Sequence, residues 1–198
     1  MAIVVDKEQK RKDIALACRD LFAVRGFTQV TISEIAKVAG VGKGTLYEYF
    51  KNKEEIVFEL VELLLQEYTS TLQEELLVQK TVRDKVKKFA EFFYIEETEQ
   101  LRKLYKGFLA LSLTAPSEEL QAFQTACFNS FYFWFAQLFV EGVKSGELIE
   151  ESLGLTKGVF VTAKGMFVSS CTTNIFGNLQ EDLNTYIDNL FNIIEVKK

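Results

Sequence analysis

Residues 31 to 50 (TISEIAKVAGVGKGTLYEYF) constrain the fold more than any other part of this chain, because they carry the pattern of two short helices joined by a tight turn. Thr31 is suited to cap the first helix, and Glu34, three residues later, can complete a capping box. Gly40 suits the left-handed position that ends a helix. The pattern therefore predicts a helix start, a helix end and a turn within twenty residues.

The apolar residues of this segment predict how the two short helices pack. Val30 and Ile35 occupy the two positions of a hydrophobic staple, which sets the angle at which the chain enters the first helix. Ala36 is small enough to let a second helix approach closely, and Leu46 and Tyr49 present an apolar side back to the first. This is the arrangement of a helix-turn-helix, whose second helix lies in the major groove of DNA.

The second short helix begins with two glycines, which are poor helix formers and cost about 1 kcal/mol each relative to alanine in a helix interior. A loose turn followed by a stub of helix is one interpretation. The other is that the absent side chains let the backbone approach DNA, while nearby hydroxyls and cations contact phosphates or base edges. The residues concerned are Gly42, Lys43, Gly44, Thr45, Tyr47 and Tyr49.

Residues 10 to 55 resemble the N-terminal domain of TetR-type transcriptional regulators. The resemblance rests on Phe22, Gly26-Phe27, Thr31-Ile32, Ile35-Ala36, Ala39-Gly40-Val41, Lys43-Gly44-Thr45-Leu46-Tyr47, Tyr49-Phe50 and Lys53-Glu54. It implies a three-helix DNA-binding domain followed by an all-helical domain for ligand binding and dimerisation. It also implies DNA contacts from Thr31, Gly42, Lys43, Gly44, Thr45, Leu46, Tyr47, Tyr49 and Lys53. Many members carry serine or threonine where this chain has Gly42, so one hydroxyl is missing here.

Charge is divided unevenly along the chain, whose net charge is −5 over 198 residues. Residues 1–53 contain 10 Lys and Arg against 6 Asp and Glu, a net charge of +4. Residues 54–198 contain 13 against 22, a net charge of −9. A basic end on an acidic body is expected of a protein that contacts phosphate with one end only.

The sequence lacks most of the side chains that an enzyme active site or a transition-metal site uses. It contains no histidine, which removes the commonest general base and most transition-metal sites. Its three cysteines, Cys18, Cys127 and Cys171, are far apart and are interpreted as free thiols of a reducing cytoplasm. We expect no enzymatic activity, no cofactor, no metal and no secretory signal. Residues 120–140 lack charge over about the length that crosses a bilayer, but their recurrent Gln, Asn, Ser and Thr favour a buried helix over a membrane span.

One proline and the absence of alternating polarity predict an all-α protein of about nine helices. We expect a helix-turn-helix domain over residues 1–52 and a larger effector-binding and dimerisation domain over residues 53–198. The expected helices beyond the two short ones cover residues 7–25, 53–75, 82–97, 99–113, 118–145, 157–176 and 180–196.

The last two helices are candidates for a dimer interface, with core packing as the alternative. The final helix carries one strong apolar stripe, and the helix before it carries small residues that permit close approach. Resemblance to the family favours a four-helix interface between two copies. The candidate residues are Gly165, Ser169, Leu183, Tyr186, Ile187, Leu190, Phe191 and Ile194.

Aromatic residues make up 13% of the chain and crowd its middle, beyond what a small helical core needs. Most aromatic residues at helical spacing are core, yet several here are expected to line an apolar pocket with a polar handle. The candidates are Phe89, Phe93, Tyr105, Phe108, Gln124, Phe128, Phe131 and Phe135.

The sequence thus predicts a DNA-binding transcriptional regulator, specifically a homodimeric bacterial repressor that binds a palindromic operator in double-stranded DNA. A small apolar or aromatic effector would release it. The alternative is a DNA-binding organiser or an adaptor for partner proteins, with the same fold and no small effector.

Overall fold

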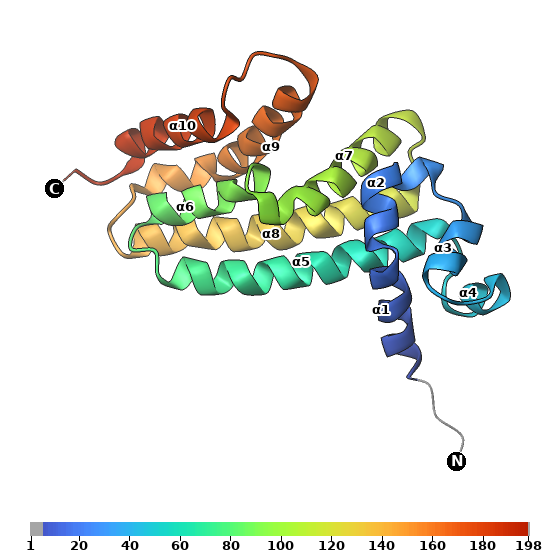
Figure 1. Cartoon of the computed structure of the whole chain (residues 1–198). Helices are drawn as coiled ribbons and strands as arrows, with labels where there is room; N and C mark the ends of the chain where they lie inside the picture. Colours follow the sequence, from blue (N-terminus) through green and yellow to red (C-terminus); the bar gives the residue numbers. More distant parts are fainter. Residues whose placement is uncertain (1–5, 198) are drawn as a thin grey trace. The chain divides into compact units, whose positions relative to one another are not determined.

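A computed structural model describes residues 6–197 of the chain. Within that range the chain forms ten α-helices and three 3-10 helices, and its β-type pairing is one isolated bridge between Leu148 and Glu195. The all-α prediction is confirmed. The helices are α1 (Lys7–Ala17), α2 (Arg19–Gln29), α3 (Ile32–Val38), α4 (Lys43–Tyr49), α5 (Lys53–Leu77), α6 (Val82–Ala90), η1 (Glu91–Phe93), η2 (Glu96–Thr98), α7 (Glu99–Thr114), α8 (Glu118–Lys144), η3 (Glu150–Leu155), α9 (Thr156–Thr172) and α10 (Leu179–Ile194) (Figure 1).

The chain divides into two compact units. The first unit contains residues up to 69 together with 99–123, and the second contains 70–98 together with the residues from 124 onward. Helices α5 and α8 contribute residues to both. In the first unit α2 packs beside α7, where the rings of Phe27 and Phe108 lie 6.4 Å apart. Phe108 also contacts Phe58 and Phe123, so an aromatic cluster joins α2, α7 and the facing parts of α5 and α8.

The helix expected over residues 7–25 is interrupted at Cys18. There the backbone N–H bonds to the carbonyl of Ala15, three residues back, and α2 starts at the next residue, Arg19. Cys18 is buried, and burial raises its thiol pKa to about 11. Within α2, Gly26 leaves helical geometry with φ 70° and ψ 162°, a positive φ that favours glycine, so the predicted helix end is confirmed as a kink inside α2. Ile14 of α1 and Phe22 of α2, on the two sides of the break, are both buried.

The helix expected over residues 82–97 ends at Ala90 and continues as two 3-10 turns. Tyr94 leaves helical geometry, with φ −141° and ψ −17°. The hydroxyl of buried Thr98 donates to the carbonyls of Phe92 at 2.8 Å and Ile95 at 3.1 Å, which satisfies groups that the broken helix leaves open. The helix α9 likewise ends earlier than expected, at Thr172 instead of residue 176.

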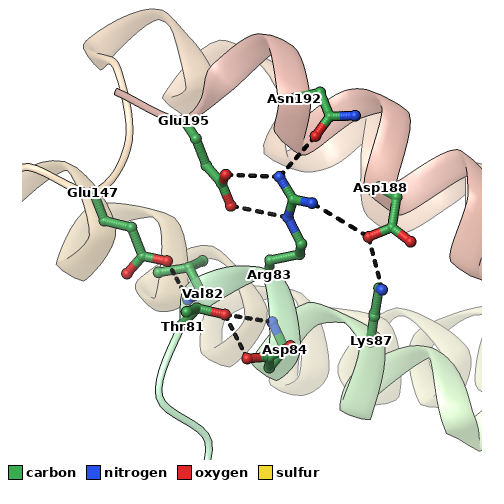
Figure 2. Close-up of polar contacts among 9 residues, drawn as sticks. All are labelled: Thr81, Val82, Arg83, Asp84, Lys87, Glu147, Asp188, Asn192 and Glu195. Atoms are coloured by element: carbon green, nitrogen blue, oxygen red, sulfur yellow. Dashed lines mark hydrogen bonds and ion pairs between the residues drawn. The ribbon is translucent and has the colours of Figure 1, made fainter. Parts of the chain in front are cut away.

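An ionic cluster joins the start of α6 to the end of α10 in the second unit (Figure 2). Arg83 pairs with Glu195 through two hydrogen bonds, Nε to Oε1 at 2.9 Å and Nη2 to Oε2 at 2.6 Å. Asp188 accepts from Lys87 at 2.7 Å, and Glu147 accepts from the backbone N–H of Val82 at 2.6 Å. Two parallel bonds fix the direction of the guanidinium, so the cluster sets how α6 and α10 align.

Candidate nucleic-acid interface and effector cavity

The start of α3 is built by the predicted capping box. The Thr31 hydroxyl accepts from the backbone N–H of Glu34, and the Glu34 carboxylate accepts from the backbone N–H of Thr31 at 2.9 Å and from its hydroxyl at 2.8 Å. The Thr31 N–H, followed by its hydroxyl, lowers the pKa of Glu34, and Arg25 adds to this effect. Val30 and Ile35, the staple residues, are both buried. The local geometry predicted from the sequence is therefore confirmed at this helix.

The turn between α3 and α4 is closed by backbone hydrogen bonds around Gly40. Its φ is 66°, the N–H of Gly40 bonds to the Lys37 carbonyl at 3.3 Å, and the N–H of Val41 bonds to the Ala36 carbonyl at 3.0 Å. These are the two bonds of a Schellman motif, which requires a left-handed residue. The motif ends α3 through bonds between neighbouring residues and leads the chain into α4.

The leading edge of α4 is open to solvent. Gly42, Lys43 and Gly44 are exposed, and Tyr47 is 56% exposed. An added Cβ at Gly44 would meet nothing within 4 Å in the described part of the chain, and at Gly42 it would meet only the Thr45 hydroxyl at 3.9 Å. Neither glycine has a positive φ. Because the fold does not require glycine at these positions, the missing side chains favour close approach by an outside molecule.

Two residues predicted to contact DNA, Leu46 and Lys53, make contacts within the protein in this structure. Leu46 is 1% exposed, so its side chain packs in the core, and its contact with DNA stays a prediction that concerns its backbone. The Lys53 ammonium donates to the carbonyls of Phe27 at 2.8 Å and Val30 at 3.0 Å, and lies 4.4 Å from the centroid of the Phe27 ring. It thus holds the C-terminal carbonyls of α2. Thr31 is exposed, while Thr45 and Tyr49 are half-buried.

Arg11 of α1 holds the end of α4, a role that the sequence did not reveal. Its guanidinium donates to the Tyr49 carbonyl, lies 4.3 Å from the centroid of the Phe50 ring and forms a 3.0 Å ion pair with Glu59 of α5. The partners Tyr49 and Glu59 stand 38 and 48 residues away, so no local pattern could have shown the contact. One side chain of α1 therefore contacts both α4 and α5, and it stabilises the C-terminal end of α4.

A small apolar cavity lies in the second unit, between α6, α8, α9 and α10. Its volume is about 30 Å³, room for one or two water molecules. A preformed site for a drug-sized ligand is typically about 300–1,000 Å³, so this cavity must enlarge to admit one. It is lined by Val86, Phe89, Ala90, Phe93, Phe135, Val159, Phe160, Ala163, Leu183, Tyr186 and Ile187.

Three of the eight predicted pocket residues line this cavity: Phe89, Phe93 and Phe135. Tyr105 and Phe108 lie in the first unit, where Phe108 belongs to the aromatic cluster described above. Gln124, Phe128 and Phe131 lie in the second unit on α8 but outside the lining. The sequence missed the α9 side of the wall, where Val159, Phe160 and Ala163 follow at helical spacing.

Polar groups stand close to the cavity-lining residues of α10 and η1. Burial, and to a smaller degree the charge of Glu91, raises the pKa of Tyr94 to about 12, although a hydrogen bond from Asn184 opposes that rise. The Asn184 Oδ1 atom is buried and has no hydrogen-bond partner among the described residues. These two side chains directly follow Phe93 and Leu183, which line the cavity.

The predicted dimer residues separate into two groups. Leu183, Ile187, Phe191 and Ile194 are at most 2% exposed in the single chain, so they pack in its own core, and their contact with a second copy stays a prediction. Gly165 is exposed, and Ser169, Tyr186 and Leu190 are half-buried. Core packing, the alternative interpretation, accounts for the inward apolar stripe of α10, because α10 contacts α6 and α9, which cover that stripe.

Two other kinds of site are absent from residues 6–197. No group of three or more acidic or cysteine side chains there could hold a metal ion. None of the helices in the same range combines the length and apolarity needed to cross a bilayer.

Comparison with known proteins identifies the family. Residues 14–60 match the family described as bacterial regulatory proteins, tetR family. The uncharacterized HTH-type transcriptional regulator YhgD of Bacillus subtilis (strain 168) is 30% identical over 142 residues, covering 70% of this chain and 72% of that protein. The chain belongs to the TetR family of transcriptional regulators.

Other similar proteins agree with this membership. The fatty acid metabolism regulator protein of Bacillus subtilis (strain 168) is 26% identical over 185 residues, covering 92% of this chain and 86% of that protein. The TetR family regulator from Cytophaga hutchinsonii shares the fold, with a TM-score of 0.79 at 15% identity over 98% of this chain and 99% of that one. This TetR family member is therefore a transcriptional regulator with a DNA-binding helix-turn-helix, and not an enzyme.

Proposed function

We propose that this TetR family protein is a homodimeric repressor that binds a palindromic operator in the bacterial cytoplasm and is released by a small apolar effector. Residues 1–52 would read the DNA, and residues 53–198 would bind the effector and the second copy. The proposal rests on the exposed start of α4 at Gly42, Lys43 and Gly44. The capping box of α3 and the turn at Gly40 position this start.

The proposed DNA contacts are Thr31, Gly42, Lys43, Gly44, Thr45, Tyr47 and Tyr49, together with the backbone of Leu46. Lys53, which the family resemblance also implies, is proposed instead to hold the C-terminal carbonyls of α2. Two copies would place their α4 helices about 34–36 Å apart, one turn of the duplex, because one short helix reads few base pairs. The exposed or half-buried residues Gly165, Ser169, Tyr186 and Leu190 remain candidates for the dimer interface.

An effector would act by preferring a form in which the two reading helices are spaced differently. Coupling of about 1–3 kcal/mol is typical and changes operator affinity by about 5- to 150-fold. An apolar effector is supported by the apolar lining of the cavity and by the relative named as a fatty acid metabolism regulator. The small cavity volume favours the alternative, an organiser or adaptor without an effector. Thermal shifts with hydrophobic compounds separate the two.

The DNA-binding proposal is tested with Lys43→Ala. We expect operator affinity to fall by about 1–3 kcal/mol if Lys43 reads a base. Fluorescence anisotropy with fragments of the protein's own promoter measures this. Lys144→Ala, an exposed lysine at the end of α8, is the control and should change nothing. Equal operator affinity for Lys43→Ala and the unmodified protein would remove Lys43 from the interface. Failure of the unmodified protein to bind any promoter fragment at low salt would overturn the repressor proposal.

A further inference from the structure

The two ends of α10 are held in different ways. At the start, the Asn178 side chain accepts from the backbone N–H groups of Gln180 at 3.1 Å and Glu181 at 3.4 Å. This cap moves with the helix, because its bonds join neighbouring residues. The preceding loop, residues 173–178, is exposed except for half-buried Phe176. The start of α10 is therefore capped without bonds to another helix.

The end of α10 is bonded to other parts of the second unit. The Ile194 carbonyl accepts from the backbone N–H of Ile149 at 2.9 Å. Just after the helix, the backbone N–H of Val196 donates to the Glu147 carbonyl at 2.9 Å. The ionic cluster adds the two guanidinium bonds from α6 to Glu195 (Figure 2). Displacing this end would break backbone hydrogen bonds and an ion pair together, and would leave polar groups unpaired.

The packing of α10 differs between its two halves in the same sense. Near the end, the buried Phe191 ring lies 6.0 Å from the ring of Phe139 of α8, and Cζ of Arg83 lies 5.9 Å from its centroid. Nearer the start, Leu183 and Ile187 border the cavity. Side chains that face a void lose the contacts that a filled space provides. The half of α10 that borders the cavity is therefore held less tightly.

A buried polar atom disfavours the closed position of this half. The Asn184 Oδ1 atom is buried and has no hydrogen-bond partner among the described residues. Burial removes its bonds to water, and a movement that exposes the atom would restore them. The Asn184 amide also bonds to Tyr94, which is half-buried, so water can replace that bond as the helix moves. Movement at this end therefore loses few polar contacts.

We propose that α10 pivots about the ionic cluster: residues 188–196 stay on α6, while residues 179–187 move away from α6 and η1 and widen the cavity. This inference rests on the proposed function, because it gives the apolar effector its way in. The α10 part of the cavity wall is Leu183, Tyr186 and Ile187, all in the half that moves. The closed cavity of about 30 Å³ has room for only one or two waters, so a wall has to move before a ligand binds.

Hydrogen exchange of the unmodified full-length protein, followed by mass spectrometry at the level of single amides, tests this pivot. Local opening exposes the amides of the segment that opens and leaves the others protected. We expect the protection factors of amides 183–187 to be about tenfold lower than those of amides 190–194, or lower still. Simple fraying predicts the reverse, because amides 190–194 lie nearer to an end of the helix.

A variant of the ionic cluster tests where the pivot lies. Arg83→Met should lower the protection of amides 190–194, because it removes the bonds that hold this half on α6. The protection of amides 183–187 should stay the same, since they already exchange through the easier opening. Lys85→Met, a half-buried lysine of α6 outside the ionic cluster, is the matched control and should change neither segment.

A variant of the cavity-side half tests the opening itself. Asn184→Leu removes the buried acceptor that has no partner, so the closed position should become more favourable. We expect the protection of amides 183–187 to rise by about tenfold. Asn189→Leu makes the same replacement at an exposed position of α10 and should leave that protection unchanged.

Equal protection of the two segments in the unmodified protein would overturn the pivot, and that comparison needs no variant to fold. Unchanged protection of amides 183–187 in Asn184→Leu would overturn it as well. Operator binding is measured in parallel. Uniform protection in a protein that binds its operator removes this inference alone. Lower protection of amides 183–187 in a protein that binds no promoter fragment at low salt removes the proposed function and keeps the pivot.

Discussion

Replacing Lys53 by methionine tests whether this lysine stabilises the helix-turn-helix domain or contacts DNA phosphate. Its ammonium donates to the carbonyls of Phe27 and Val30 at 2.8 and 3.0 Å, with that of Thr28 at 3.5 Å. A hydrogen bond to a charged group is worth about 1.5–3 kcal/mol, and Lys53 is only half-buried, so we take the lower half of that range. Methionine keeps the length and can still pack on the Phe27 ring.

We therefore expect Lys53→Met to lower the free energy of unfolding by about 1.5–2 kcal/mol, which for a chain of this size lowers Tm by about 3–8 °C. Urea unfolding and calorimetry measure the two quantities. Lys51→Met is the matched control, because the Lys51 side chain is 90% exposed and its Nζ is 3.8 Å from Glu55. That variant should unfold like the unmodified protein.

The same variant distinguishes the two roles through the salt dependence of operator binding. A lost phosphate contact reduces the slope of log Kobs against log salt by about 0.9, whereas a lost stabilising contact leaves the slope unchanged. We expect an unchanged slope. A reduced slope together with unchanged stability would refute our reasoning, since Lys53 would then leave the α2 carbonyls to contact DNA.

Two further predictions concern stability alone. Gly142→Ala should lower the free energy of unfolding by about 1–3 kcal/mol, because the new Cβ would lie 2.8–2.9 Å from the buried side chains of Leu148 and Val82. Urea unfolding measures this, and an unchanged midpoint would show that the contact can relax. For Glu34, hydrogen bonds from Thr31 lower the pKa below its ordinary 4.5 in the folded state, so the carboxylate stabilises the fold above that pH and the effect is lost as pH falls through the folded pKa. The stability difference between the unmodified protein and Glu34→Gln should therefore shrink in acid, and a difference that is constant with pH would contradict the capping-box assignment.

The helix-turn-helix could be predicted almost residue by residue because its determinants are local. The Thr31–Glu34 cap and the Gly40 turn join residues at most five positions apart. Such contacts depend on residue type and spacing, which the sequence displays directly. The start of α5 is also set by a local contact, because the Asn52 side chain accepts from the Glu55 N–H at 2.8 Å.

The interior of the body could not be predicted in the same way. The aromatic residues expected in one pocket are divided between two units: Phe108 packs with Phe27, while Phe89, Phe93 and Phe135 line the cavity. Periodicity identifies which face of a helix is apolar but not which neighbour covers it. The inward stripe of α10 illustrates this, since the same pattern suits a core and a dimer interface.

By itself, the sequence determined the all-α class and the basic N-terminal end of the chain, because both follow from composition and pattern. It also determined the capping box, the turn and the hydrophobic staple of the helix-turn-helix, because each depends on neighbouring residues. Only the tertiary structure decided that Lys53 and Arg11 bond to backbone carbonyls of the helix-turn-helix domain, that α10 turns its apolar stripe inward, and that Phe89, Phe93 and Phe135 line one cavity. Those outcomes depend on contacts between residues far apart in the chain, whose partners are selected by packing and not by local propensity.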